Sequence, residues 1–106
     1  MFNKKSNEGY LSPLDGILRK TLVHGESMLM TEFNMKEGSA IPLHSHPHEQ
    51  IGYLISGQIR FSAGSEQVVC NPGDSWCFAG DEEHGAEVLK DSVIVEVFSP
   101  VREEYL

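Results

Sequence analysis

The chain has 106 residues and a formal net charge of −8, with 8 Lys and Arg against 16 Asp and Glu. This length suits one domain with one small core, and the acidic balance argues against a nucleic-acid partner, whose phosphates attract basic surfaces. No apolar run approaches the ~20 residues of a membrane-spanning helix, so no membrane partner is expected. The N-terminal residues lack the apolar segment of a signal peptide, and a cytoplasmic location is the expectation.

Short apolar or alternating segments, separated by turn residues, follow a polar start. Residues 1–12 predict an arm with little structure of its own, and residues 13–106 a single domain. Alternation over 16–23 and a Met-rich run over 27–35 come first, and strands are then expected over 51–55, 59–62, 67–70, 75–79, 86–89 and 92–98. No segment longer than about ten residues keeps a helical period, and only the tail 101–106 is expected to form a short turn. The predicted class is all-β, a sandwich or barrel.

The larger apolar side chains and the cysteines have simple structural interpretations. Core or pocket wall is expected for Met28, Met30, Phe33, Tyr53, Phe61, Trp76 and Phe78. Cys70 and Cys77 form no CxxC motif, and two buried free thiols are expected, although the sequence leaves a disulfide open.

Three of the five histidines lie within residues 44–48, His-Ser-His-Pro-His. Residues two apart in a strand share a face, so His44 and His46 are expected to point the same way, and Gln50 has the same parity. Leaving such groups buried without a partner costs roughly 1–3 kcal/mol each, and imidazole nitrogens with an amide oxygen suit a divalent first-row metal. A histidine run in an exposed loop is the alternative, and the position of His48 stays open.

This segment resembles the first motif of the cupin superfamily, G-x5-H-x-H-x3,4-E-x6-G. The matching residues are Gly38, His44, His46, Gln50 and Gly57, with Gln50 in place of the usual Glu. The second motif, G-x5-P-x-G-x2-H-x3-N, is matched by the separation of Gly73 and His84, while Ala79, Asp81 and Val88 depart from it. The resemblance spans residues 14–100 and implies a double-stranded β-helix, a small jelly-roll barrel with a metal inside.

The resemblance also implies a metal site. Its ligands would be His44, His46, Gln50 and His84, and its cofactor a divalent transition metal: Zn, Ni, Fe, Mn, Co or Cu. An amide cancels no charge, so the ion would keep its full +2 charge and act as a stronger Lewis acid toward an anionic ligand.

The end of the chain carries a closer likeness. Together with the histidine cluster, residues 93–105 resemble the KdgF-type cupins of pectin and alginate breakdown, which convert 4,5-unsaturated monouronates into linear keto acids. The resemblance implies catalytic roles for Glu96, Phe98 and Arg102, with Glu96 where those cupins have Asp. The implied partner is a small anionic, sugar-like substrate, with Arg102 on its carboxylate and Glu96 moving a proton.

Several alternatives remain open at this point. Glu96 alternates with Ile94 and Phe98 and is expected to face inward, but a surface position, or a contact that orients a ligating histidine, is also compatible with the pattern. Arg102 could instead form a surface ion pair with Glu103 or Glu104. The chain as a whole could be another metal-dependent cupin enzyme, a dioxygenase or isomerase, or a non-catalytic small-molecule or sugar-binding cupin. A homodimer is expected, because small jelly rolls commonly pair through faces or edge strands.

Overall fold

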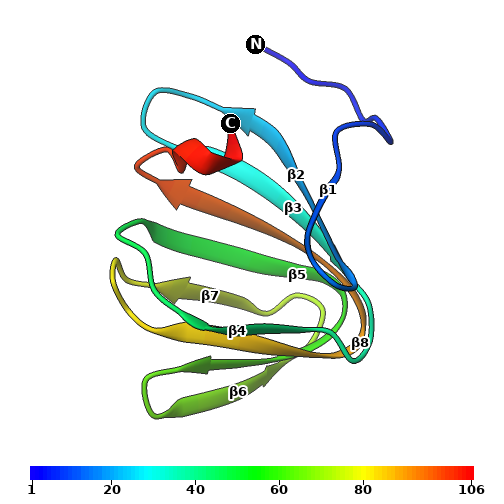
Figure 1. Ribbon diagram of the computed structural model, residues 1–106, viewed down its shortest axis with the longest axis vertical. Coiled ribbons are helices and arrows are strands. Elements are labelled where there is room, and N and C mark those ends of the chain that lie inside the picture. Colours follow the sequence, from blue (N-terminus) through cyan, green and yellow to red (C-terminus); the bar gives the residue numbers. More distant parts are fainter.

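The computed structural model describes residues 1–106 and is built almost entirely of β-strands (Figure 1). The elements are β1 (Leu11–Leu14), β2 (Ile17–His24), β3 (Leu29–Met35), β4 (Ala40–His44), β5 (Glu49–Ala63), β6 (Glu66–Cys70), β7 (Ser75–Phe78), β8 (His84–Ser99) and the 3-10 turn η1 (Glu103–Tyr105). The predicted all-β class is confirmed. None of the chain's helical structure is long and apolar enough to cross a membrane.

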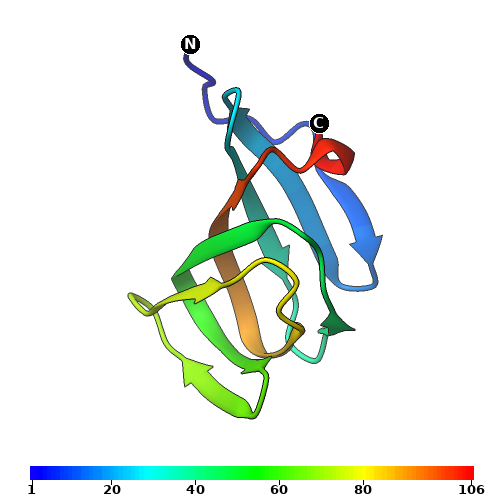
Figure 2. The same cartoon turned by 90° about the vertical axis from the view of Figure 1, so that its left-hand side faces the viewer.

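Two long strands, β5 and β8, connect the two halves of the barrel. All pairings are antiparallel, in the order β1-β2-β3-β8-β5-β6, with β4 also on β8 and β7 also on β5. The N-terminal half of β5 lies beside the C-terminal half of β8, between β7 and β3, whereas their other halves lie between β6 and β4. Both strands therefore bend from one sheet into the other, and this closes a jelly-roll barrel (Figure 2).

The bends explain why each long strand was predicted as two short ones. The turn-like Ser56-Gly57 and Lys90-Asp91 sequences lie inside β5 and β8, where the register of the pair shifts. Gly57 has φ +97, and a Cβ there would lie 2.1 Å from Ser92 Oγ, so only glycine permits this close crossing. Two further differences are β4, which was not predicted, and β1, which begins at Leu11 inside the predicted arm.

The core lies between the two halves of the barrel. Its buried members are Ile17, Phe33, Met35, Leu54, Ile59, Phe61, Cys70, Phe78, Ala86, Val88 and Ile94. The expectation that Met28, Met30 and Tyr53 are core or wall was wrong: their exposed fractions are 54%, 37% and 48%. Met30 and Tyr53 occupy the outward positions of β3 and β5, where the strand period of two places every second side chain. Both cysteines are free, but only Cys70 is buried and Cys77 is exposed.

Candidate active site

The histidines meet at one end of the barrel, because three strand ends converge there. His44 is the last residue of β4 and His84 the first of β8, and the two are cross-strand partners. His46 lies in the turn between β4 and β5, and Gln50 follows early in β5. His44, His46 and Gln50 were expected to share one face of a single strand. The structure differs, because β4 ends at His44 and β5 begins only at Glu49. The turn at residues 45–48 interrupts the strand and still brings these side chains together.

One ring nitrogen from each of His44, His46 and His84 lies within 4.8 Å of the other two. The ring centroids of His44 and His84 are 4.4 Å apart, and those of His46 and His84 are 5.1 Å apart. The ring of His84 also stacks on Phe78, at 4.5 Å between centroids. Three imidazoles converging at this separation form a group that could hold a metal ion.

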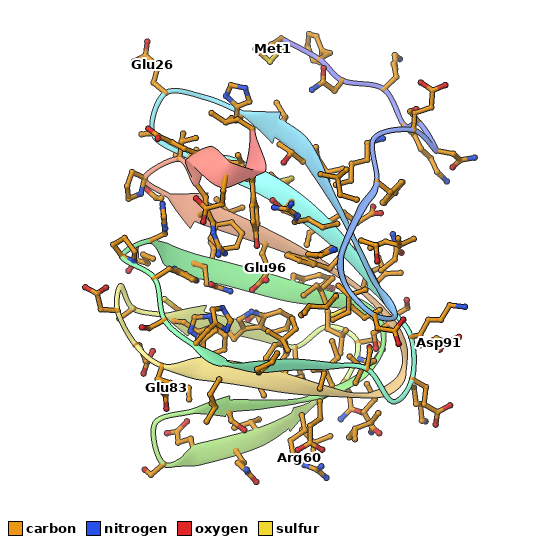
Figure 3. The ribbon with its side chains drawn as sticks, in the orientation of Figure 1. Met1, Glu26, Arg60, Glu83, Asp91 and Glu96 are labelled. Atoms are coloured by element: carbon orange, nitrogen blue, oxygen red, sulfur yellow. The ribbon has the colours of Figure 1, made fainter.

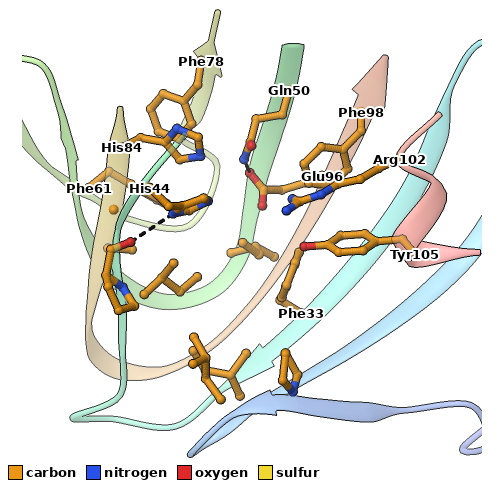
Figure 4. A pocket seen from close by; sticks show the side chains of 18 residues that line it. Phe33, His44, Gln50, Phe61, Phe78, His84, Glu96, Phe98, Arg102 and Tyr105 are labelled. Carbon is orange, nitrogen blue, oxygen red and sulfur yellow. Dashed lines mark hydrogen bonds between the residues drawn. The ribbon is translucent and has the colours of Figure 1, made fainter. Parts of the chain in front are cut away.

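The hydrogen bonds of the histidines leave metal-binding nitrogens free. His84 Nδ1 lies 2.8 Å from the Glu82 carbonyl oxygen, and His44 Nδ1 lies 3.0 Å from the Pro42 carbonyl oxygen (Figure 4). In each case the carbonyl accepts from Nδ1–H, so Nε2 keeps its lone pair. His84 Nε2 and His46 Nδ1 are buried with no hydrogen-bond partner in the protein. Unpaired buried nitrogens of this kind fit a divalent transition metal.

Burial favours the neutral form of His46 and His84. It is the main cause that lowers the pKa of both His46 and His84, with neighbouring positive groups, Arg102 among them, acting in the same direction. A neutral imidazole is the form that binds a metal, so the local environment favours the competent state at neutral pH.

Gln50 connects the histidines to a buried carboxylate. Its Oε1 accepts from His46 Nε2 at 2.7 Å, and its Nε2 donates to Glu96 Oε2 at 2.5 Å. A glutamate at position 50 would place a second carboxylate against Glu96, and two like charges at this distance repel strongly. The departure from the motif at Gln50 thus has a local physical reason.

Glu96 faces the interior, which excludes the surface alternative. Its exposed fraction is 5%, and it points inward while the other labelled acidic side chains, Glu26, Glu83 and Asp91, lie at the periphery (Figure 3). Glu96 Oε2 also accepts from Trp76 Nε1 at 2.9 Å. Burial raises the pKa of Glu96, although the hydrogen bonds from Trp76 and Gln50 and the charge of Arg102 oppose that shift. A buried carboxyl group with a raised pKa inside a cavity is a candidate general acid or base.

The carboxylate depends on a glycine for its tryptophan partner. Gly52 is opposite Trp76 in the β5–β7 pair, and a Cβ on Gly52 would lie 2.2 Å from the indole ring. We expect Gly52→Ala to displace Trp76, break its hydrogen bond to Glu96 and lower the free energy of unfolding by about 1–3 kcal/mol. Trp76 is the only tryptophan in the chain, so its fluorescence emission reports the displacement directly. Gly25→Ala is the control, because nothing lies within 4 Å of its Cβ position; unchanged emission in Gly52→Ala would contradict the prediction.

Arg102 forms an ion pair and also lines the cavity. Its Nε donates to Glu104 Oε1 at 2.7 Å, which is the ion pair of the surface alternative. The side chain is nevertheless only 14% exposed and lines the same cavity as Glu96, with its guanidinium 5.1 Å from the centre of the Phe98 ring. Because Glu104 occupies Nε, the terminal nitrogens of Arg102 remain available to a ligand. Phe98 is 1% exposed and forms part of the cavity wall.

These side chains surround a cavity of about 290 Å³ (Figure 4). Its polar lining is His44, Gln50, His84, Glu96, Arg102 and Tyr105, and its apolar lining includes Ile17, Phe33, Ile41, Phe61, Phe78, Ala86, Ile94 and Phe98. This volume is at the small end of ligand pockets, which span roughly 300–1,000 Å³, and it suits a ligand no larger than a single sugar unit.

Two functional neighbours were missed by the sequence reasoning. Trp76 was interpreted as core or wall, and Tyr105 was given no role. The contact of Trp76 with Glu96 joins β7 to β8, which are not paired with each other, so no local pattern indicates it. Tyr105 reaches the cavity from η1. The only sequence feature that could have indicated this position is an aromatic residue among the charged residues of the tail.

The comparisons agree with this architecture. The family model described as "Cupin domain" matches residues 31–99. Among solved structures, KdgF from Halomonas sp. superposes with a TM-score of 0.94 at 28% identity, over 100% of both chains. An RmlC-like cupin from Shewanella frigidimarina NCIMB 400 has a TM-score of 0.93 at 22% identity, over 99% of this chain and 95% of that one. A predicted oxalate decarboxylase from Thermotoga maritima has a TM-score of 0.79 at 20% identity, over 95% of this chain and 100% of that one. No curated protein is similar enough in sequence to match.

The fold and the histidine group define a small single-barrel protein with a metal-binding type of site at one end. This chain belongs to the cupin family, and within that family it is similar over its whole length to KdgF from Halomonas sp..

Proposed function

We propose that this cupin is a metal-dependent isomerase that opens the ring of 4,5-unsaturated monouronates to give linear keto acids, as the KdgF-type resemblance implies. The observation that carries the proposal is the placement of Glu96, a buried carboxylate with a raised pKa, in the same small cavity as His44, His84 and Arg102. The free thiols of Cys70 and Cys77 support a reducing, cytoplasmic setting for this reaction.

The proposed reaction moves one proton and needs no oxidant. The bond between C1 and the ring oxygen breaks, the C1 hydroxyl loses its proton to become an aldehyde, and the resulting enolate gains that proton on C4 to become a ketone. Glu96 is the group placed to carry this proton, held by Gln50 and Trp76. The terminal nitrogens of Arg102 bind the substrate carboxylate.

The metal site completes the proposal. His44, His46 and His84 would hold a divalent ion. The Gln50 amide oxygen, which accepts from His46 Nε2 in the metal-free site, would become a fourth ligand only if the ion displaced that hydrogen bond. Bound there, the ion supplies Lewis-acid polarisation of the substrate oxygens. The apolar walls of Phe78 and Phe98 exclude water and strengthen electrostatic effects around the reacting groups.

The test follows the conjugated double bond of 4,5-unsaturated galacturonate, whose ultraviolet absorbance disappears on ketonisation. Metal-loaded protein is expected to accelerate this loss over the uncatalysed rate, and His46→Ala and Glu96→Ala to abolish the acceleration. Glu83→Gln, an exposed acidic residue, should retain it. A metal-loaded protein that gives no acceleration would overturn the proposal for this substrate class.

We also propose that a second copy of this chain covers the outward face of β3, β8 and β5. Met30, Val97 and Ile51 form one cross-strand row there, and Val95 and Tyr53 lie in the next. Ile51 and Tyr53 are 51% and 48% exposed, and Met1 and Phe2 of the arm, 87% and 95% exposed, line the same groove as Met30. Glu32, which lies opposite Val95, is the one charged side chain in these two rows. Two chains of charge −8 repel each other less across such a mostly apolar face than across the acidic remainder of the surface.

The dimer is tested at Ile51, in the middle of this face. Ile51→Asp is expected to yield a monomer in sedimentation velocity, because it places charges opposite one another across the two-fold axis. Val68→Asp, an equally exposed position on β6, is the control and should leave the dimer intact. A wild-type protein that sediments as a monomer at all concentrations would contradict the proposal.

A further inference from the structure

The C-terminal turn places an aromatic hydroxyl in the cavity. Thr21 Oγ1 donates to the carbonyl oxygen of Tyr105 and so anchors η1 to β2. The Tyr105 ring makes edge contacts with Phe98, at 5.3 Å between centroids, and with Phe33, at 6.4 Å. Its position is therefore held by both backbone and ring contacts, which preorganises the side chain.

Two guanidinium groups lie against the Tyr105 ring. The Arg19 Cζ atom is 3.9 Å and the Arg102 Cζ atom 4.3 Å from its centroid. The chain as a whole is acidic, yet both guanidinium groups against this ring are positive, and Glu96 is the acidic group near enough to act on its hydroxyl. This end of the cavity therefore favours a negatively charged ligand group.

The hydroxyl itself is free to donate. Figure 4 shows the Tyr105 oxygen directed into the cavity, and Tyr105 is one of the residues that line it. The side-chain hydrogen bonds of the protein include none that this hydroxyl donates. Burial raises the pKa of Tyr105, so the hydroxyl stays protonated across the physiological range and keeps its hydrogen for a ligand.

We propose that Tyr105 is a further substrate-binding residue, whose hydroxyl and the terminal nitrogens of Arg102 together form a subsite for a carboxylate. Arg19 is a positioning residue, since its guanidinium lies over the Tyr105 ring and Arg19 does not line the cavity. The inference deepens the proposed function and rests on it for the identity of the ligand, a uronate.

The test compares wild-type protein with Tyr105→Phe, which keeps the ring, its packing and both guanidinium contacts and removes only the hydroxyl. The probe is D-galacturonate, which has no double bond to react, titrated calorimetrically into the metal-loaded proteins. A hydrogen bond to a charged group is strong enough that the variant should bind at least tenfold more weakly. With the unsaturated substrate, KM should rise more than kcat falls. Tyr10→Phe, in the N-terminal arm, is the matched control and should bind as wild type does.

The outcomes separate this inference from the proposed function. Equal galacturonate affinity in wild type and Tyr105→Phe would overturn the inference, and so would no binding by the wild type. Equal weakening for D-galactose, which lacks the carboxylate, would also overturn it, because the hydroxyl would then only shape the cavity. Binding of galacturonate that depends on Tyr105, in a protein that does not turn over the unsaturated uronate, would support the subsite and contradict the proposed reaction alone.

Discussion

Glu96→Gln is expected to lower turnover of the unsaturated uronate by about 100-fold to 10,000-fold, the range typical of a lost general acid or base. The glutamine oxygen can still accept from Trp76 and Gln50, so the variant retains the contacts of Glu96 Oε2 and loses only the titratable proton. Galacturonate affinity should change far less than kcat. A variant with wild-type kcat would remove Glu96 from the proton transfer and leave it as a structural residue.

The same substitution should stabilise the metal-free protein at high pH. Because burial raises the pKa of Glu96, the folded state holds this proton more tightly than the unfolded chain does. The stabilisation from that proton is fully present below the ordinary glutamate pKa and is lost as pH rises through the folded-state value. Urea unfolding of chelator-treated protein should therefore show Glu96→Gln and wild type nearly equal at pH 4.5, with the variant about 1–3 kcal/mol more stable at pH 8. A difference in unfolding free energy between the variant and the wild type that shrinks as pH rises would contradict the raised pKa of Glu96.

His84→Ala is expected to lower metal affinity by at least 100-fold and to reduce turnover in proportion. His84 contributes one of three converging ring nitrogens, and its Nε2 is buried with no partner in the protein. Second-sphere changes alone typically lower metal affinity 10-fold to 100-fold, so loss of a ligand should exceed that range. Metal content after dialysis against a weak chelator measures the effect. His24→Ala is the control, because His24 is exposed at the end of β2.

The pH dependence of this site follows from the lowered pKa values of His46 and His84. As pH falls below the ordinary histidine value, the unfolded chain takes up protons before the folded site does. The stability that these neutral histidines contribute is therefore present above that value and is lost as pH falls through the folded-state values. In metal-free protein, NMR titration should show both rings protonating at lower pH than the same histidines do in the urea-unfolded chain. Equal titration in the folded and unfolded protein would contradict the effect of burial. Unchanged metal content in His84→Ala would separately contradict the ligand assignment.

Some of the site was accessible from spacing alone. The motif spacing from Gly38 to Gly57 predicted that His44, His46 and Gln50 belong to one metal site. Alternation along residues 93–98 predicted that Glu96 and Phe98 face inward. Both are local patterns, because a strand alternates faces and a short turn cannot separate its ends far. The inward position of Glu96 is confirmed by its burial. Alternation shows which residues share a face of a strand, but it does not show which of the two faces is exposed to solvent. For that reason Met30 and Tyr53 were wrongly placed in the core.

What the sequence by itself determined is the all-β class, the cupin motif and the residue types that suit a metal and a proton transfer. Only the tertiary structure decided that β5 and β8 are single bent strands, that Gln50 lies between His46 and Glu96, and that Trp76 and Tyr105 complete the surroundings of the carboxylate and the cavity. The physical reason is the range of the interactions. Strand alternation and motif spacing act over a few residues, whereas these contacts join segments distant in the chain, whose meeting depends on how the two sheets close around the core.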